Sequence, residues 1–152
     1  MYKKKKNVFI LLFVLSGYSS LSQTTVIPFG SAWKYWANTE VNAPVAAWKG
    51  DAAFDDAGWP AGPGRLGFGG DGEITCIPSG TSCAPGCTPG GVCVKYTTTY
   101  FRKIIAIPDI NVFTSFIINL IRDDGAVIYI NGQEVWRSNM NGGTVGYSTF
   151  AA

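Results

Sequence analysis

The stretch of residues 96–137 limits the fold of this chain more than any other part of the sequence. Its apolar residues are mostly β-branched or aromatic, and turn-forming residues interrupt them at short intervals, which is typical of consecutive strands. We predict antiparallel strands at residues 96–107, 116–121, 126–130 and 133–137. The last three are close enough in sequence to form a meander.

Three turn sequences separate these strands. Pro108-Asp109 ends the first predicted strand, and Asp123-Asp124-Gly125 turns the chain before the third. Asn131-Gly132 joins the last two strands, and this pair is typical of two-residue hairpins because both central positions need a positive φ. The sequence therefore predicts an all-β fold with almost no helix.

The composition agrees with many short elements in one domain. The 152 residues include 19 Gly and 8 Pro, and only 14% are charged. So many turn-forming residues disfavour a long-helix bundle or a coiled coil. In the first half, residues 33–36 alternate in polarity and are expected to open a sheet, whereas the glycine-rich residues 58–72 are expected to form a loop.

The first 22 residues have the parts of an export signal. Four lysines, an apolar run too short to span a bilayer, and the small residues before Gln23 follow one another in that order. We therefore expect a signal peptide at residues 1–22. The mature module at residues 23–152 is expected to be secreted or held at the cell surface, without membrane insertion.

Removing that segment changes the charge balance. The chain has 12 Lys and Arg against 10 Asp and Glu, and four of the lysines lie at positions 3–6, which leaves 8 against 10 and a net charge of −2. No basic patch remains to hold a phosphate backbone, so nucleic acid is not an expected partner. The absence of histidine excludes His-dependent catalytic triads and His-ligated zinc sites.

Four cysteines are confined to a segment rich in Gly, Pro, Ser and Thr: Cys76, Cys83, Cys87 and Cys93. In an exported protein we expect two disulfides, which would staple a loop at residues 76–93 that cannot bury a core of its own. A four-thiolate zinc site is the alternative, but gaps of six, three and five residues fit its usual spacing poorly. Three pairings are possible, and the local one (Cys76 with Cys83, Cys87 with Cys93) is only slightly favoured over the nested one.

Several short motifs occur in a characteristic order: 27–35 (Ile-Pro-Phe-Gly-Ser-Ala-Trp-Lys-Tyr), Trp48, Phe54-Asp55-Asp56, Trp59, Gly67-Phe68-Gly69, 98–102 (Thr-Thr-Tyr-Phe-Arg) and 122–132 (Arg-Asp-Asp-Gly-Ala-Val-Ile-Tyr-Ile-Asn-Gly). In this order they resemble the secreted β-sandwich modules of the galactose-binding-like type, which accompany bacterial extracellular hydrolases and cell-surface proteins. Two of the pieces also look like the sugar-binding jelly rolls of β-glycosidases.

The resemblance implies an antiparallel β-sandwich of jelly-roll topology. Such modules usually have further strands after the point that corresponds to Ala152, so we expect the chain to be a fragment that lacks its last strands, with further domains in the same polypeptide. Without those strands, a sheet edge and part of the apolar face would be open to water.

Tryptophan is the residue type best suited to stack on sugar rings, and the chain has five. Most of them are expected in the core of so small a domain. We predict Trp36 and Trp136 as the exposed ones and, with Arg122, as the candidate ligand-binding residues. The expected partner is a polysaccharide or a cell-surface glycan.

Asp123 and Asp124 are the candidate metal ligands, because adjacent carboxylates can hold calcium through oxygen atoms. The Asp-Asp-Gly sequence resembles that of calcium-dependent, sugar-binding adhesin modules of the protective-antigen type. The alternative, which we favour, is that both residues only form the turn, because two carboxylates fall short of the six to eight oxygens that calcium takes. No other cofactor is expected.

These features predict a non-catalytic accessory module of an exported protein, directed to carbohydrate. Glu40, Glu73 and Glu134 lie in or beside turns, with no sign of the paired carboxyl groups of a glycosidase, so the module itself is not expected to be an enzyme. The alternatives are a structural spacer or protein-docking domain, a fragment of a secreted hydrolase, and a calcium-dependent adhesin module.

Overall fold

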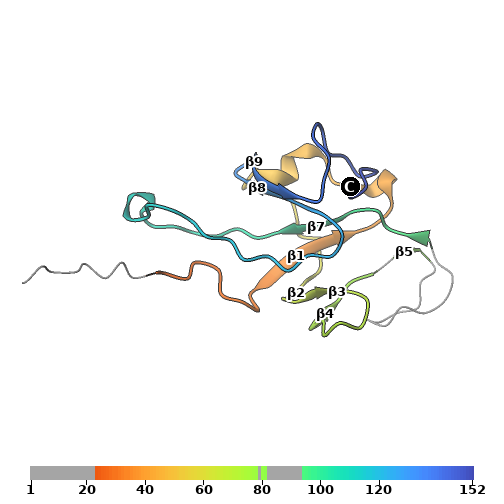
Figure 1. The fold of residues 1–152 in the computed structure, drawn as a ribbon, viewed down its shortest axis with the longest axis horizontal. Helices are drawn as coiled ribbons and strands as arrows, with labels where there is room; N and C mark the ends of the chain where they lie inside the picture. The colour runs from red at the N-terminus through yellow and green to blue at the C-terminus, as the bar shows by residue number, and fades with distance from the viewer. Residues whose placement is uncertain (1–22, 79, 82–93) are drawn as a thin grey trace, which may run out of the picture.

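Short β-strands dominate the structure, a computed structural model that describes residues 23–78, 80–81 and 94–152 (Figure 1). The strands are β1 (Ala32–Ala37), β2 (Ala61–Pro63), β3 (Leu66–Gly67), β4 (Thr75–Cys76), β5 (Gly80–Thr81), β6 (Val94–Lys95), β7 (Thr99–Arg102), β8 (Ala126–Ile130) and β9 (Gln133–Ser138). The helical segments are single 3-10 turns: η1 (Glu40–Asn42), η2 (Ala46–Lys49) and η3 (Ile110–Val112). The predicted all-β class with little helix is therefore confirmed for these residues.

A three-stranded antiparallel sheet, in the order β2-β1-β7, carries the packed part of the molecule. Strand β1 pairs with β2 through Ala32, Trp33 and Lys34, and with β7 from Lys34 to Ala37. The predicted strand at residues 33–36 is thus confirmed. The loop predicted at residues 58–72 is only partly correct, because β2 and β3 lie within it.

The β8–β9 hairpin follows the turn chemistry of its sequence. Asn131 and Gly132 have φ values of 49° and 82°, as a two-residue hairpin turn requires. A register shift between Ile128 and Tyr129 places a bulge in the hairpin. Both predicted strands are confirmed, and β9 runs one residue further than predicted.

The predicted strand at residues 116–121 is wrong. These residues are not part of a strand, and within the described chain none of them makes a ladder to a neighbour. Their side chains are largely in solvent; Ile117 is 70% exposed and Ile121 66%. A β-branched sequence becomes a strand only where another strand accepts its backbone hydrogen bonds, and here the meander is reduced to the β8–β9 pair.

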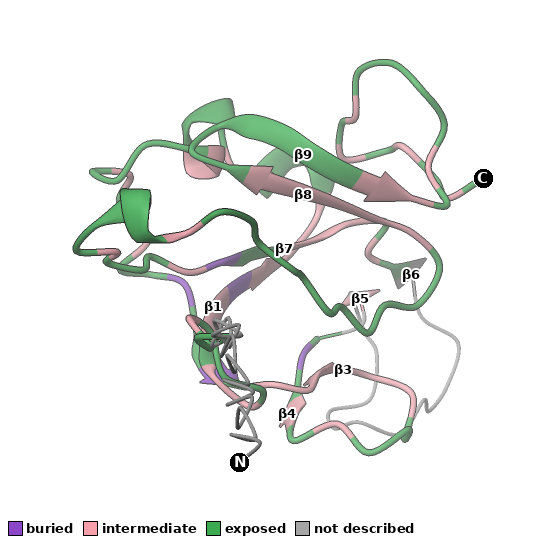
Figure 2. Ribbon diagram, turned by 60° about the vertical axis from the view of Figure 1, so that its left-hand side comes forward, coloured by how far each residue is buried: buried purple, intermediate pink, exposed green. Residues whose placement is uncertain are grey.

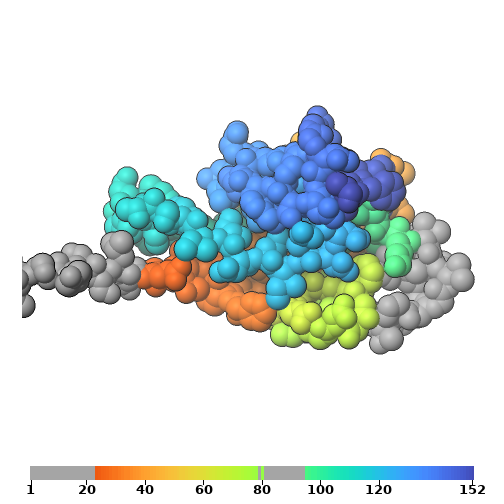
Figure 3. All heavy atoms as spheres, in the orientation of Figure 1, coloured from red at the N-terminus to blue at the C-terminus, as the bar shows by residue number. Residues whose placement is uncertain are grey.

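The predicted strand at residues 96–107 is shortened for a similar reason. Only Thr99–Arg102 pairs with β1, and residues 103–107 leave the sheet. Lys103, the first residue after the ladder, donates from its ammonium to the carbonyl of Ala32 at 2.8 Å. The chain between β7 and β8 then runs over the surface of the molecule (Figures 2 and 3).

Aromatic rings fill the space on one face of the central sheet. Trp59 is 8% exposed, and it contacts Trp36, Trp48 and Phe54 at centroid distances of 6.0, 6.5 and 5.8 Å. Tyr35, on the other face of β1, is also buried. Figure 2 shows that the buried stretches are short and lie mainly in and beside this sheet.

Trp48 connects the hairpin to the sheet. Its ring lies 5.2 Å from that of Tyr100 in β7 and 6.1 Å from that of Tyr129 in β8. The backbone N–H of Gly132 also donates to the carbonyl of Lys49. A Cβ atom on Gly50 would lie 2.5 Å from the Gly132 nitrogen, so this close approach requires glycine at position 50.

Candidate functional site

Two cations and a carboxylate meet on the aromatic face of the central sheet. Lys34 of β1 and Arg102 of β7 are direct partners in the ladder, so their side chains leave the sheet on the same face. Asp56 comes from the segment between η2 and β2 and reaches both of them. Its Oδ1 accepts from Lys34 Nζ at 2.5 Å, and its Oδ2 accepts from Arg102 Nη1.

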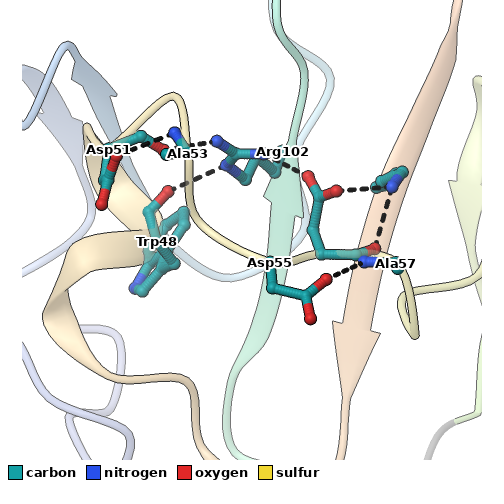
Figure 4. Close-up of polar contacts among 8 residues, drawn as sticks. Trp48, Asp51, Ala53, Asp55, Ala57 and Arg102 are labelled. Carbon is teal, nitrogen blue, oxygen red and sulfur yellow. Dashed lines mark hydrogen bonds and ion pairs between the residues drawn. The ribbon is translucent and has the colours of Figure 1, made fainter.

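Arg102 also donates two hydrogen bonds to the backbone of the same segment. Its Nε donates to the carbonyl of Trp48 at 3.2 Å and its Nη2 to the carbonyl of Asp51 at 2.6 Å (Figure 4). The guanidinium carbon also lies 5.6 Å from the centre of the Phe54 ring. Arg102 is only 9% exposed, so these contacts hold the segment that covers the sheet.

The same segment is stiffened by two short aspartate turns. Asp51 Oδ1 accepts from the N–H of Ala53 at 2.8 Å, and Asp55 Oδ1 accepts from the N–H of Ala57 at 3.0 Å (Figure 4). Asp55 therefore forms a turn, whereas its neighbour Asp56 points to the two cations.

The two cations change the acidity of Asp56. The hydrogen bond from Lys34 makes the largest contribution, Arg102 adds to it, and together they hold the pKa of Asp56 below its ordinary value despite the desolvation of the carboxylate. Asp56 is therefore ionised at neutral pH and is already paired.

A cavity of about 300 Å³ opens beside this ion cluster. It lies where β7 ends, so that β1 continues to Trp33 and Ala32 without β7 beside it. The cavity is lined by Ala32, Trp33, Lys34, Asp56, Ala61, Arg102, Lys103 and Ile104. It is shallow and largely apolar, although four of these eight residues carry a charge.

Lys103 and Trp33 lie next to each other in the lining of the cavity. The Lys103 ammonium lies 5.9 Å from the centre of the Trp33 ring, which is near the outer limit of cation–π attraction. Its one hydrogen bond among the described residues goes to the Ala32 carbonyl. An ammonium has three donors, so two of those on Lys103 remain available to a ligand.

This arrangement suits binding better than hydrolysis. The residues around the cavity include one aromatic platform and several N–H donors, but a single carboxylate, Asp56. General acid–base cleavage of a glycosidic bond needs two carboxyl groups on opposite sides of the bond. A sugar ring could instead stack on Trp33 while its hydroxyl groups accept from Lys103, the cation next to that ring.

The ligand-binding residues predicted from the sequence do not converge. Trp36 is half-buried, stacks on Trp59 and donates its indole N–H to the carbonyl of Asn42 at 2.7 Å. Trp136 lies on β9 with 42% of its surface exposed. Arg122 is exposed and donates to Ser138 Oγ and to the carbonyl of Asp124. Within the described chain, no hydrogen bond or ring contact joins these three side chains.

Asp123 and Asp124 take part in a local turn. Asp123 Oδ1 accepts from the N–H of Asp124, whose φ is 59°. The carbonyl of Asp124 accepts from Arg122 and from Asn139. No group of three or more acidic, Cys or His side chains suited to a metal occurs in the part of the chain that the structure describes. This geometry supports the turn interpretation, and the calcium site stays a prediction.

The cysteine predictions mostly lie outside the described residues. Cys76 ends β4 and is not a free thiol. The other three positions, 83, 87 and 93, fall in the segment that the structure does not describe. Two disulfides, and the choice among their pairings, therefore stay predictions.

Sequence reasoning missed Lys34, Arg102 and Lys103, and it counted Trp33 among the core tryptophans. Only one signal pointed to them: Trp33-Lys34-Tyr35 and Phe101-Arg102 place cations inside strands that are otherwise aromatic. A cation in a buried strand usually has a carboxylate partner. That partner, Asp56, is 46 residues from Arg102, and only the strand register brings the two together.

No protein-family model, curated protein or solved structure matches the chain in comparisons with known proteins. The galactose-binding-like resemblance therefore stays a prediction, and function has to be inferred from the geometry of the cavity. No helix that the structure describes has the length and apolar character needed to cross a bilayer.

Proposed function

We propose that the chain is a non-catalytic module of an exported protein that binds carbohydrate, built on a jelly-roll β-sandwich of the galactose-binding-like type. The observation that carries this proposal is the cavity at the end of β7, which Trp33, Lys34, Asp56 and Lys103 help to line, with the Lys103 ammonium 5.9 Å from the centre of the Trp33 ring. An aromatic platform with a few polar groups at its edge is the usual composition of a sugar subsite.

The fold supports the proposal through the way it presents Trp33. Strand β1 is held on one side by β2 up to Ala32, but β7 stops opposite Lys34. Trp33 is thereby fixed in a strand that is paired with β2, while no residue of β7 pairs with it on the other edge of β1. A rigid aromatic side chain loses little conformational entropy when a ligand binds.

Affinity gel electrophoresis tests the proposal. The protein, Trp33→Ala and Trp136→Ala are run through gels that contain plant, algal or bacterial polysaccharides. At least one polysaccharide should retard the protein, and Trp33→Ala should lose that retardation, because the stacking platform is gone. Trp136→Ala should keep it. Equal migration of the protein in every gel, or loss of retardation only in Trp136→Ala, would contradict the proposal.

The spacer or protein-docking alternative is favoured by a different observation. Residues 116–121 expose a run of apolar side chains, among them Phe116, Ile118 and Leu120, and such a surface is uncommon on an isolated soluble domain. If no polysaccharide retards the protein, this alternative becomes the better explanation.

A further inference from the structure

We infer that the ligand of this cavity is an anionic carbohydrate, in which a carboxylate or sulfate group of the sugar is bound by Lys103 beside Trp33. This inference rests on the proposed function and deepens it, because it names the chemical class of the sugar. It depends on the charges around the cavity, on the free donors of Lys103 and on the position of its ammonium.

The charges around the cavity do not balance. Three cations line it, Lys34, Arg102 and Lys103, against one carboxylate, Asp56. Asp56 is shared between Lys34 and Arg102. The third cation, Lys103, has no carboxylate partner among the described residues, and its ammonium donates to a neutral carbonyl, that of Ala32. The cavity therefore has a local excess of positive charge in a module whose sequence, without residues 1–22, is acidic overall.

Arg102 and Lys34 are unsuited to binding the anion themselves. Arg102 is buried, with three acceptors around its guanidinium. Lys34 donates to both the side chain and the carbonyl of Asp56. Moving either away would leave the Asp56 carboxylate short of a partner, which costs more than a new exposed contact returns. Lys103, which makes no ion pair among the described residues, can bind a ligand without such a loss.

The position of Lys103 suits a charged sugar. Its ammonium lies over the Trp33 ring at 5.9 Å, a distance at which the cation–π attraction is weak. A sugar that stacks on the indole brings the groups on its ring next to Nζ. A carboxylate or sulfate there would form a charge-assisted hydrogen bond, which is stronger than the one that a neutral hydroxyl offers.

Pairs of polymers with the same backbone test this inference. De-esterified polygalacturonate is compared with its fully methyl-esterified form, and dextran sulfate with dextran. The protein should bind at least one charged member several-fold more tightly than its neutral counterpart, and added salt should reduce the difference, because exposed charges are screened. The polygalacturonate pair reports on carboxylate and the dextran pair on sulfate.

Variants then locate the effect. Lys103→Gln should lower the affinity for the charged polymer about fivefold, as expected for one exposed ion pair, and should leave the neutral polymer unchanged. Lys103→Arg should restore most of it. Lys49→Gln removes the same charge beside Tyr129 on the hairpin and is the matched control. A thermal melt of each variant verifies that it is folded.

The possible failures can be told apart. If Trp33→Ala abolishes binding but charged and neutral polymers bind the protein equally, the cavity binds sugar and the inference about charge is wrong. If Lys103→Gln and Lys49→Gln weaken binding equally, the attraction follows net charge and the assignment to Lys103 is wrong. If no polymer binds, the proposed function fails together with the inference.

Discussion

The end of β7 and the turn before β8 both gather charged side chains, but they use them differently. At the end of β7, Lys34, Asp56 and Arg102 come from three separate segments, and Lys103 remains with free donors beside Trp33. At the turn before β8, Arg122, Asp123 and Asp124 bind one another, and their other hydrogen bonds go to Ser138 and Asn139 at the end of the same hairpin. Charged side chains that strand pairing brings together from distant parts of the chain can surround a cavity. Adjacent carboxylates mainly stabilise the turn in which they lie.

The two regions also differ in burial. Arg102 is 9% exposed and donates to one carboxylate and two carbonyls. Arg122, which donates to a hydroxyl and a carbonyl, is exposed. A hydrogen bond in a desolvated place is costly to lose, since the groups left behind cannot find water. Stability should therefore depend on the first arginine far more than on the second.

Among the substitutions at the two charged regions, Arg102→Ala is expected to lower the free energy of unfolding most. Its loss leaves the Asp56 carboxylate with Lys34 alone and removes a donor from the carbonyls of Trp48 and Asp51. Breaking a buried pair in this way costs about 3 to 5 kcal/mol. Arg122→Ala, the matched control, should cost less than about 1 kcal/mol. Urea unfolding followed by tryptophan fluorescence measures both, and equal losses would remove the distinction between the two regions.

The next effect is a dependence of stability on pH. The pKa of Asp56 is lowered in the folded protein from its ordinary value of 3.8, so the ion pairs stabilise the fold fully above that value. The stabilisation is lost as the pH falls through the lowered pKa. Unfolding of the protein and of Asp56→Asn, followed from neutral pH into acid, should show a shallower acid loss in the variant. Identical pH profiles would mean that the cluster is not formed in solution.

A smaller effect is expected at Asp123 and Asp124. Their oxygens serve the turn, so replacing both by Asn should cost at most about 1 kcal/mol, as weakened capping does. Calcium should not change the melting temperature of the unmodified protein. A rise with calcium that chelator reverses and the double variant lacks would instead establish the metal site, because ligand binding stabilises the folded state by mass action.

The smallest effect is expected in residues 116–121. Ile117 is 70% exposed, and Ile117→Ala should change the free energy of unfolding by no more than about 0.5 kcal/mol. Ile77, which is 5% exposed, provides the comparison, since Ile77→Ala should cost about 2 to 5 kcal/mol. A large loss in Ile117→Ala would mean that this segment is packed in solution.

Local chemistry predicted part of the fold. The Asn131-Gly132 turn and the strands beside it depend on adjacent residues, and both were predictable. The absence of a strand at residues 116–121 was not predictable, because a strand also needs a partner, and no pattern within six residues shows whether one is present. The same applies to residues 103–107, which leave the sheet after Arg102.

The site was less predictable than the fold. Adjacent acidic residues and the tryptophans expected to be exposed pointed to Asp123, Asp124, Trp36 and Trp136, none of which lines the cavity. The cavity instead depends on the pairing of Lys34 with Arg102, on the position of Asp56 above them, and on the place where β7 ends. These are contacts between distant parts of the chain, and the strand register that creates them is not visible in the sequence.

The most direct test of the carbohydrate site is a map of the residues that sense the ligand. Amide and indole N–H signals of the isotope-labelled protein are followed by NMR during titration with galacturonate oligosaccharides, and in parallel with sulfated dextran oligosaccharides. Shifts should concentrate in Ala32, Trp33 and residues 102–104, including the indole of Trp33. Shifts concentrated at Arg122, Asp123 and Trp136 instead would contradict this prediction and would place the site on the hairpin.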